Sequence, residues 1–166
     1  MKAYRLALAR YGGDARAVFS GLSGFSADGR WHASGRHLDY AAESRSLATL
    51  ERLVHYKRFD HLEPHVLCVA EIPDDFIREL PRTPTGWDGQ EPSPQAQALG
   101  NAWCDRRESP ALRVPSAVMR GEFNLLLNSQ HPQWSWDWVA GPVPFSFDRR
   151  LGELLREARR RSPGRS

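Results

Sequence analysis

The sequence has little cysteine and no long apolar run. Cys68 and Cys104 are the two cysteines among its 166 residues, too few for a disulfide framework and consistent with a reducing compartment. No stretch approaches the ~20 apolar residues that a membrane helix needs, and residues 1–11 are too short and too charged for a signal peptide. We therefore expect a cytoplasmic protein that has no membrane partner.

Several motifs that would identify a chemistry are also missing. The glycine-rich stretch 21–29 lacks the Gly-Lys-Ser/Thr ending of a P-loop and the G-x-G-x-x-G spacing of a dinucleotide fold. Neither Ser23 nor Ser26 lies in the G-x-S-x-G turn of an α/β-hydrolase. His61 and His65 are four residues apart, but Pro64 between them disrupts the helix that such a metal-binding pair requires. We expect no metal and no bound cofactor.

The positive charge is concentrated at one end. The net charge is +3, and residues 156–166 alone contribute +4 through five arginines and one glutamate. A nucleic-acid-binding protein should instead carry its basic surface on the folded body. We predict a single domain over residues 1–155, followed by an Arg-rich, frayed tail over 156–166. The tail leaves open, as an alternative, a protein that acts on nucleic acid, such as an RNase.

The apolar patterning predicts a mixed α+β domain. Apolar runs or period-2 alternation predict strands in five segments: 4–8, 66–72, 112–118, 134–139 and 145–148. Helical spacing predicts helices at 43–58 and 95–106. Segment 20–35 is expected to be a long loop with one short strand near Trp31, and 81–94 an irregular surface excursion. This order of elements differs from a regular βαβ series.

Glu51 occupies an unusual place in the first predicted helix. It lies at the margin of an apolar stripe that includes Leu47 and Val54, which is expected to face the core. A carboxylate there must find polar partners, because burying an unpaired charge is costly. The alternative is a salt bridge at the helix edge, to Arg45 or His55.

Four other polar residues are candidates for a site. Arg30 lies between a glycine and a tryptophan and could direct its guanidinium at a phosphate, although a surface arginine is the simpler interpretation. Tyr40 could stack on a planar ligand or belong to the core. Ser116 follows a proline at a predicted bulge, where a hydroxyl can face a cleft. Asn124 could bridge or cap backbone groups.

Taken in order, these residues resemble the RES-domain family, which is named for an arginine, a glutamate and a serine. The resemblance covers the stretches 4–6, 29–31, 40–44, 47–51, 99–103, 112–118, 122–128, 131–132 and 145–151. Arg30, Glu51 and Ser116 match the three naming positions, and Tyr40 matches an aromatic residue of the family's site. The chain departs from the family where His32 replaces a frequent asparagine.

The resemblance implies a compact α+β fold similar to ADP-ribosyltransferase toxins. It also implies that NAD⁺ is a substrate, cleaved at the nicotinamide–ribose bond by water or phosphate. The expected partner is an Xre-like helix-turn-helix antitoxin, which would contact DNA for both proteins within a complex that contains a homo-oligomer of the toxin. Two alternatives remain: transfer of ADP-ribose to a protein, and a non-catalytic module that binds the antitoxin.

Each candidate residue receives a role from this hypothesis. Glu51 would stabilise a cationic ribose electrostatically, and Arg30 would bind the pyrophosphate. Tyr40 would stack on nicotinamide. Ser116 would donate a hydrogen bond in the nicotinamide pocket, and Asn124 would contribute to substrate binding.

Overall fold

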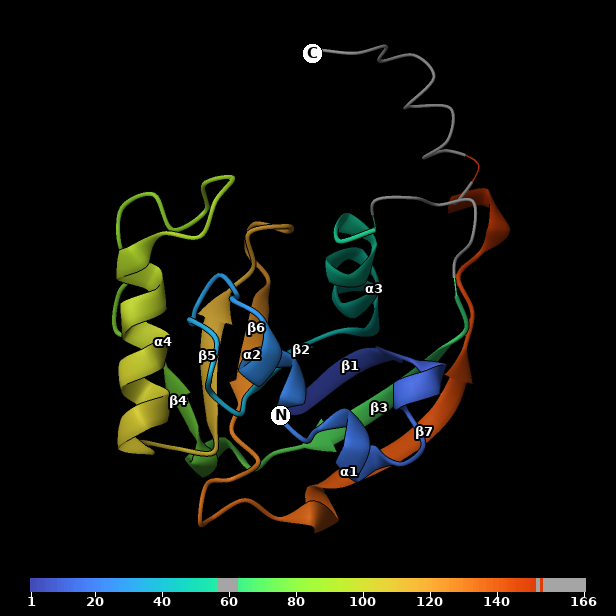
Figure 1. The fold of residues 1–166 in the computed structure, drawn as a ribbon, viewed down its shortest axis with the longest axis horizontal. Coiled ribbons are helices and arrows are strands. Elements are labelled where there is room, and N and C mark those ends of the chain that lie inside the picture. Colours follow the sequence, from blue (N-terminus) through green and yellow to red (C-terminus); the bar gives the residue numbers. More distant parts are fainter. Residues whose placement is uncertain (57–62, 152, 154–166) are drawn as a thin grey trace.

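The computed structural model of the chain contains one seven-stranded sheet (Figure 1). The structure describes residues 1–56, 63–151 and 153, so the predicted tail 156–166 lies outside the described residues. The strand order is β4-β5-β6-β2-β1-β3-β7. The strands are β1 (Lys2–Leu8), β2 (Asp39–Ala42), β3 (His65–Glu71), β4 (Ile77–Glu79), β5 (Ala111–Pro115), β6 (Phe123–Leu127) and β7 (Val139–Phe145). The β4–β5 pair is parallel, and the other pairs of these strands are antiparallel.

Short helices connect and cover the strands. The α-helices are α1 (Ala15–Val18), α2 (Leu22–Ser26), α3 (Arg45–Val54) and α4 (Pro94–Arg106), and the 3₁₀ turns are η1 (Ala9–Tyr11), η2 (Asp74–Phe76) and η3 (Trp136–Trp138). Ser44 caps α3 by accepting a hydrogen bond from the backbone N–H of Leu47, and Ser93 caps α4 in the same way. Both caps satisfy N–H groups that a helix start leaves free. No helix among the described residues is long and apolar enough to cross a membrane.

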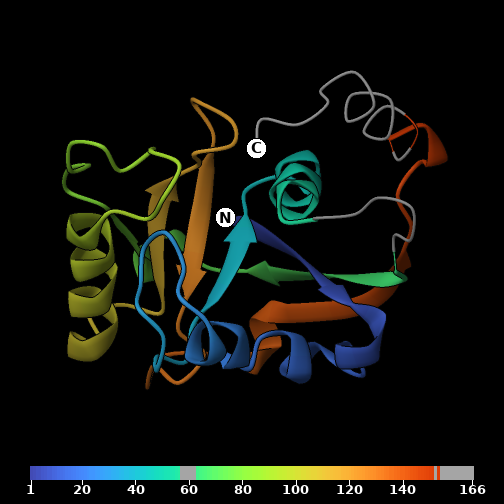
Figure 2. The same cartoon turned by 45° about the horizontal axis from the view of Figure 1, so that its top comes forward.

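Alternation along the strands divides the core between the two faces of the sheet. One face packs against α1 and the tryptophans of η3, through residues such as Ala41, Cys68 and Leu125. The other face carries α3, which covers Leu6 and Leu67, and α4, which packs over the β5–β6 end. Figure 2 shows α3 and α4 standing apart, with β5 and β6 between them in this view.

The strands predicted at 134–139 and 145–148 are wrong. Trp136–Trp138 forms a 3₁₀ turn capped by Ser135, and the strand lies between the two predicted segments, at Val139–Phe145. The compact turn lets Trp134 meet the rings of Trp136 and Trp138 nearly edge to face, a favourable aromatic geometry. The sheet accepts Pro142 and Pro144 because β7 is an edge strand that pairs with β3 on one side.

Two local predictions also need correction. Segment 20–35 contains the short helix α2, and the strand expected near Trp31 is an isolated bridge between Gly29 and His32. In α3, Val54 is 57% exposed, whereas Leu47 and Ala48 are buried. Leu53 is buried as well, and Leu47 and Ala48 pack with Leu6 of β1 and Ala42 of β2.

Candidate functional site

Glu51 is held by two neutral donors on the α3 side of the sheet. Its Oε1 accepts hydrogen bonds from Ser116 Oγ at 2.7 Å and from Asn124 Nδ2 at 2.5 Å. Its Oε2 has no hydrogen bond to any part of the chain that the structure describes. The salt bridge to Arg45 or His55, the alternative that the sequence left open, is not among the contacts of the described residues. The carboxylate is thus fixed through one oxygen and keeps the other available.

The hydroxyl of Ser116 is fully used. Ser116 follows the end of β5 and is 1% exposed. Its Oγ accepts the backbone N–H groups of Val118 at 3.1 Å and Met119 at 3.0 Å, and its proton goes to Glu51. A hydroxyl has one donor and two acceptor sites, so Ser116 could bind another group only by releasing one of these partners.

Asn124 reaches Glu51 from the centre of the sheet. It lies on β6, opposite Ala42 of β2 and Val114 of β5. Its neighbour Leu125 packs on the α1 face of the sheet, so alternation places the Asn124 side chain on the α3 face. The side chain is 8% exposed. An amide at this register position can aim its N–H at the underside of α3.

One nitrogen of the Arg30 guanidinium anchors the side chain. Nη1 donates to the carbonyl oxygens of Trp87 at 2.7 Å and Gly89 at 2.9 Å, both in the 81–94 excursion. Nε and Nη2 have no partner within the described ranges. Arg36 uses this same pair of nitrogens to bind Asp105 through both carboxylate oxygens. Arg30 therefore retains the fork that binds carboxylate or phosphate in a bidentate way.

Helix α4 fixes the turn that carries Arg30. Gln97 Nε2 donates to the carbonyl oxygens of Gly29 at 3.0 Å and His32 at 3.2 Å, the two ends of that turn. Gly100 allows the helix to approach the turn closely, since a Cβ at Gly100 would lie 1.8 Å from the carbonyl oxygen of Trp31. Sequence reasoning missed the roles of both Gln97 and Gly100.

Tyr40 lies within electrostatic reach of both principal charges. Its hydroxyl is 3.0 Å from the backbone nitrogen of Trp31 and 3.0 Å from Nδ1 of His32. Burial raises the pKa of the phenol far above its ordinary value. The Trp31 N–H and the positive charge of Arg30 act in the lowering direction on that pKa, and the negative charge of Glu51 adds to the increase. Tyr40 thus hydrogen-bonds to the Arg30 turn, and the charge of Glu51 acts on its hydroxyl.

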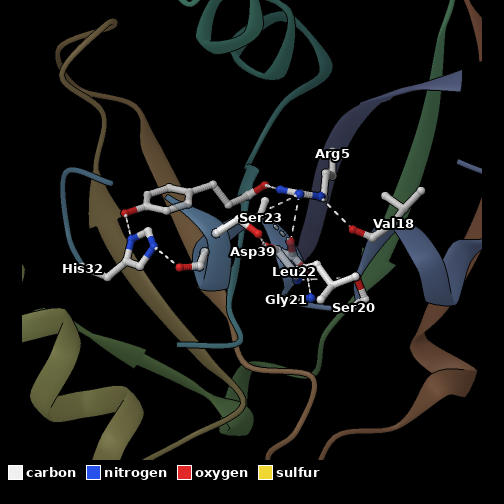
Figure 3. Close-up of polar contacts among 11 residues, drawn as sticks. Arg5, Val18, Ser20, Gly21, Leu22, Ser23, His32 and Asp39 are labelled. Carbon is white, nitrogen blue, oxygen red and sulfur yellow. Dashed lines mark hydrogen bonds and ion pairs between the residues drawn. The ribbon is translucent and has the colours of Figure 1, made fainter. Parts of the chain in front are cut away.

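The backbone of Tyr40 is fixed by a buried ion pair (Figure 3). Arg5 Nη1 donates to the Tyr40 carbonyl at 2.7 Å, and Arg5 Nη2 lies 2.8 Å from Asp39 Oδ1. Asp39 in turn accepts hydrogen bonds from the Gly21 backbone at 2.7 Å and from the Ser23 hydroxyl at 2.9 Å. This network joins β1 and β2 to the loop before the Arg30 turn. An arginine inside an apolar strand was the available signal, and sequence reasoning did not use it.

His65 belongs to a different cluster, at the far end of α3. Its Nδ1 donates to the Glu63 carbonyl at 2.7 Å, and its Nε2 accepts from Arg52 Nε at 3.0 Å and from the Tyr56 hydroxyl at 2.9 Å. His61 lies outside the described residues. Among residues 1–56, 63–151 and 153, no group of three or more acidic, histidine or cysteine side chains could hold a metal ion.

The fold resembles a solved toxin–antitoxin structure. A chain in the crystal structure of the M. tuberculosis MbcT–MbcA toxin–antitoxin complex matches with a TM-score of 0.63 at 15% identity, over 94% of this chain and 88% of that one. The expected architecture, a compact α+β domain similar to ADP-ribosyltransferase toxins, is confirmed.

Sequence comparison identifies closer relatives. The chain is 34% identical to Toxin Res of Yersinia enterocolitica over 91% of this chain and 99% of that protein. It is 38% identical to Toxin Res of Pseudomonas putida over 72% and 83%, and 32% identical to the Prs ADP-ribosylating toxin of a Sphingobium species over 68% and 73%. The family model of the RES domain matches residues 2–148. The chain therefore belongs to the RES-domain family.

Proposed function

We propose that this chain is the toxin of a toxin–antitoxin pair and that it consumes NAD⁺ by cleaving the nicotinamide–ribose bond. Membership of the RES-domain family and the names of the relatives support the toxin role. The observation that carries the chemistry is the Glu51 carboxylate, which is anchored through Oε1 by Ser116 and Asn124 and has Oε2 available.

An anchored carboxylate suits dissociative cleavage of this bond. Nicotinamide leaves as a neutral base from a positively charged ring, so its departure needs no proton donor. The reaction instead develops positive charge on the ribose, in an oxocarbenium-like transition state. A negative group already fixed in place stabilises that charge without reorganising during the reaction. Glu51 Oε2 is the atom that we assign to this task.

The other candidate residues divide into ligand contacts and positioning groups. Arg30 would bind the pyrophosphate through Nε and Nη2, the fork left free by its backbone contacts. Tyr40 would stack against nicotinamide. Ser116 and Asn124 would act through Glu51: the hydroxyl of Ser116 has no unused site for a ligand, which argues against the direct contact with nicotinamide suggested by the resemblance.

The test is release of nicotinamide from NAD⁺ by the purified protein, compared with Glu51→Gln. In this variant the amide oxygen faces the two donors, Ser116 and Asn124, and the amide NH₂ takes the place of Oε2. The fold is kept while the negative charge is lost. We expect the rate to fall about 10²- to 10³-fold, as for the loss of one preorganised electrostatic group.

A matched control is Glu71→Gln. Glu71 is an exposed carboxylate at the end of β3 whose ion pair with Lys2 spans 3.9 Å, and we expect this variant to keep the wild-type rate. Glu51→Gln activity equal to that of the control would remove Glu51 from the mechanism. Absence of nicotinamide release by the wild-type protein would refute NAD⁺ cleavage itself.

A second candidate activity is transfer of ADP-ribose to a protein, because one relative is named an ADP-ribosylating toxin. Both reactions break the same bond and differ in what attacks the ribose. NAD⁺ labelled in its adenylate part separates them: transfer leaves the label on a protein band, whereas cleavage by water or phosphate leaves it on a small molecule.

The proposed partner is an Xre-like helix-turn-helix antitoxin, which would contact DNA for the pair. The fold match to a chain from a toxin–antitoxin complex supports a partner of the antitoxin class. A small helix-turn-helix reading frame beside this gene, whose product co-purifies with the chain and suppresses nicotinamide release, is the expected result. The molar mass of that complex measures whether the toxin is a homo-oligomer within it.

A further inference from the structure

His32 is a buried histidine whose two ring nitrogens are both engaged. The residue is 2% exposed, and Figure 3 shows its contacts on either side of the ring. Nε2 lies 3.1 Å from the carbonyl oxygen of Gly24, and Nδ1 lies 3.0 Å from the Tyr40 hydroxyl. A carbonyl oxygen can only accept, so the Nε2 atom carries the proton.

The protonation state of the His32 ring determines which partner donates in the hydrogen bond between His32 and Tyr40. Burial lowers the pKa of His32, and the charge of Arg36 acts in the same direction, whereas the backbone carbonyls of Gly24 and Ala27 and the carboxylate of Asp28 act against it. A neutral imidazole with its proton on Nε2 has a lone pair on Nδ1. The Tyr40 hydroxyl therefore donates its proton to Nδ1.

The Tyr40 oxygen is left with one available position. It donates to His32 and accepts the backbone N–H of Trp31 at 3.0 Å. Because a phenol oxygen has one proton and two acceptor positions, the remaining position can only accept. A ligand group that meets this oxygen must be a hydrogen-bond donor.

Two glycines make room for this arrangement. A Cβ on Gly29 would lie 2.6 Å from both the Tyr40 hydroxyl and the His32 ring, and a Cβ on Gly24 would lie 3.0 Å from His32 Nε2. The backbone at Gly24 and Gly29 therefore packs closely against the pair. His32 restricts the rotation of the Tyr40 hydroxyl proton. The Tyr40 ring itself is held by the surrounding core as well as by His32.

We infer that His32 is a positioning residue that holds the Tyr40 hydroxyl as an acceptor for an N–H or O–H group of the substrate. This inference rests on the proposed function, in which Tyr40 contacts NAD⁺. The carboxamide N–H groups and the ribose hydroxyls of NAD⁺ are both donors of this class. An incoming group that could only accept would meet the lone pair of Tyr40 and be rejected.

Two substitutions separate the contacts of His32. Asparagine places its amide oxygen near the position of Nδ1, where it can accept from Tyr40, and loses the bond to Gly24. Glutamine places its amide nitrogen near the position of Nε2, where it can donate to Gly24, and loses the acceptor for Tyr40. The two variants have similar polarity and each removes one hydrogen bond of the same histidine.

The measurement is KM and kcat for nicotinamide release. We expect His32→Asn to stay within about threefold of the wild-type KM and His32→Gln to raise KM about tenfold, the effect of one lost hydrogen bond. In a Tyr40→Phe background the difference between the two variants should disappear, because the hydroxyl is absent. A purely structural role would leave that difference unchanged. The inference would be overturned if His32→Asn and His32→Gln had equal KM values in the protein that retains Tyr40. It would also be overturned if the difference between them survived in Tyr40→Phe.

A second readout does not depend on catalysis. Nitrogen-15 NMR of labelled histidine reports which ring nitrogen carries the proton and whether the other accepts a hydrogen bond. We expect a neutral ring protonated at Nε2, whose Nδ1 resonance moves in Tyr40→Phe. A proton found on Nδ1 would refute the inference even in an active enzyme. If the wild-type protein released no nicotinamide, the proposed function would fail and this measurement would still decide the hydroxyl geometry.

Discussion

Acidification should destabilise the protein through His65. This residue begins β3, and its ring contacts the C-terminal end of α3, the helix that carries Glu51. His65 is 2% exposed, and its Nε2 already accepts hydrogen bonds from Arg52 and Tyr56. A second ring proton would point at the guanidinium of Arg52. Burial, followed by the charge of Arg52, lowers the pKa of His65 from 6.5 to about 4.

The sign and size of the effect follow from this pKa. The unfolded chain binds a proton near pH 6.5, whereas the folded protein does so only near pH 4, so unfolding takes up a proton between these values. Stability is therefore fully present above about pH 6.5 and falls as the pH decreases toward about 4. The whole interval corresponds to about 3 kcal/mol of unfolding free energy, of which about 2 kcal/mol is lost by about pH 5.

Urea unfolding at about pH 7.5 and about pH 5, for wild type and His65→Gln, measures this contribution. The glutamine cannot titrate, so any fixed cost of the substitution cancels between the two pH values. His32, whose pKa is also lowered, is present in both proteins and cancels too. We expect the wild type to lose about 2 kcal/mol more than the variant over this interval. An equal loss in both proteins would refute the assignment to His65.

Two further substitutions test how the site is supported. Gly100→Ala should lower the free energy of unfolding by about 1–3 kcal/mol, because the new Cβ would lie 1.8 Å from the Trp31 carbonyl oxygen. This loss should exceed the gain from the higher helix propensity of alanine. Urea unfolding measures the change, and an unchanged or higher stability would contradict the close packing. Asp39→Asn should lower it by about 3 kcal/mol or more, because it leaves Arg5 without its buried ion-pair partner; a change below about 1 kcal/mol in thermal or urea unfolding would show that the pair is dispensable.

The elements that the sequence predicted well have strong local signals. Strand β1 is mostly apolar and β3 contains the apolar run 66–70, and α3 and α4 have helical spacing and a serine cap. The elements that it missed depend on pairing with distant segments. Strand β7 contains two prolines and a glycine and exists because β3 provides its partner. Strand β4 has three residues and is defined by its pairing with β5.

The site shows the same division between local and distant information. The apolar stripe of α3 predicted Glu51 at its margin, and in the structure Glu51 is half-buried beside the buried residues Leu47 and Ala48. Its partner Ser116 is 65 residues away, a contact that no spacing rule could predict. Gln97 and Gly100 carry no chemical signal of their own, although the stretch 99–103 was part of the family resemblance.

The two charges of the site each have neutral hydrogen-bond partners. Glu51 is bound by a hydroxyl and an amide, and Arg30 is bound by two backbone carbonyls. In the described part of the chain the two residues form no ion pair with each other, so neither charge is neutralised, while both charges act on the pKa of Tyr40. NAD⁺ carries a complementary pair of charges, an anionic pyrophosphate and a cationic nicotinamide ring. A direct Arg30–Glu51 bridge would stabilise the empty protein and would have to break before either group could bind. Anchoring each charge by a neutral partner avoids that cost, which is the physical reason to prefer a substrate of this charge pattern over one that is uniformly anionic.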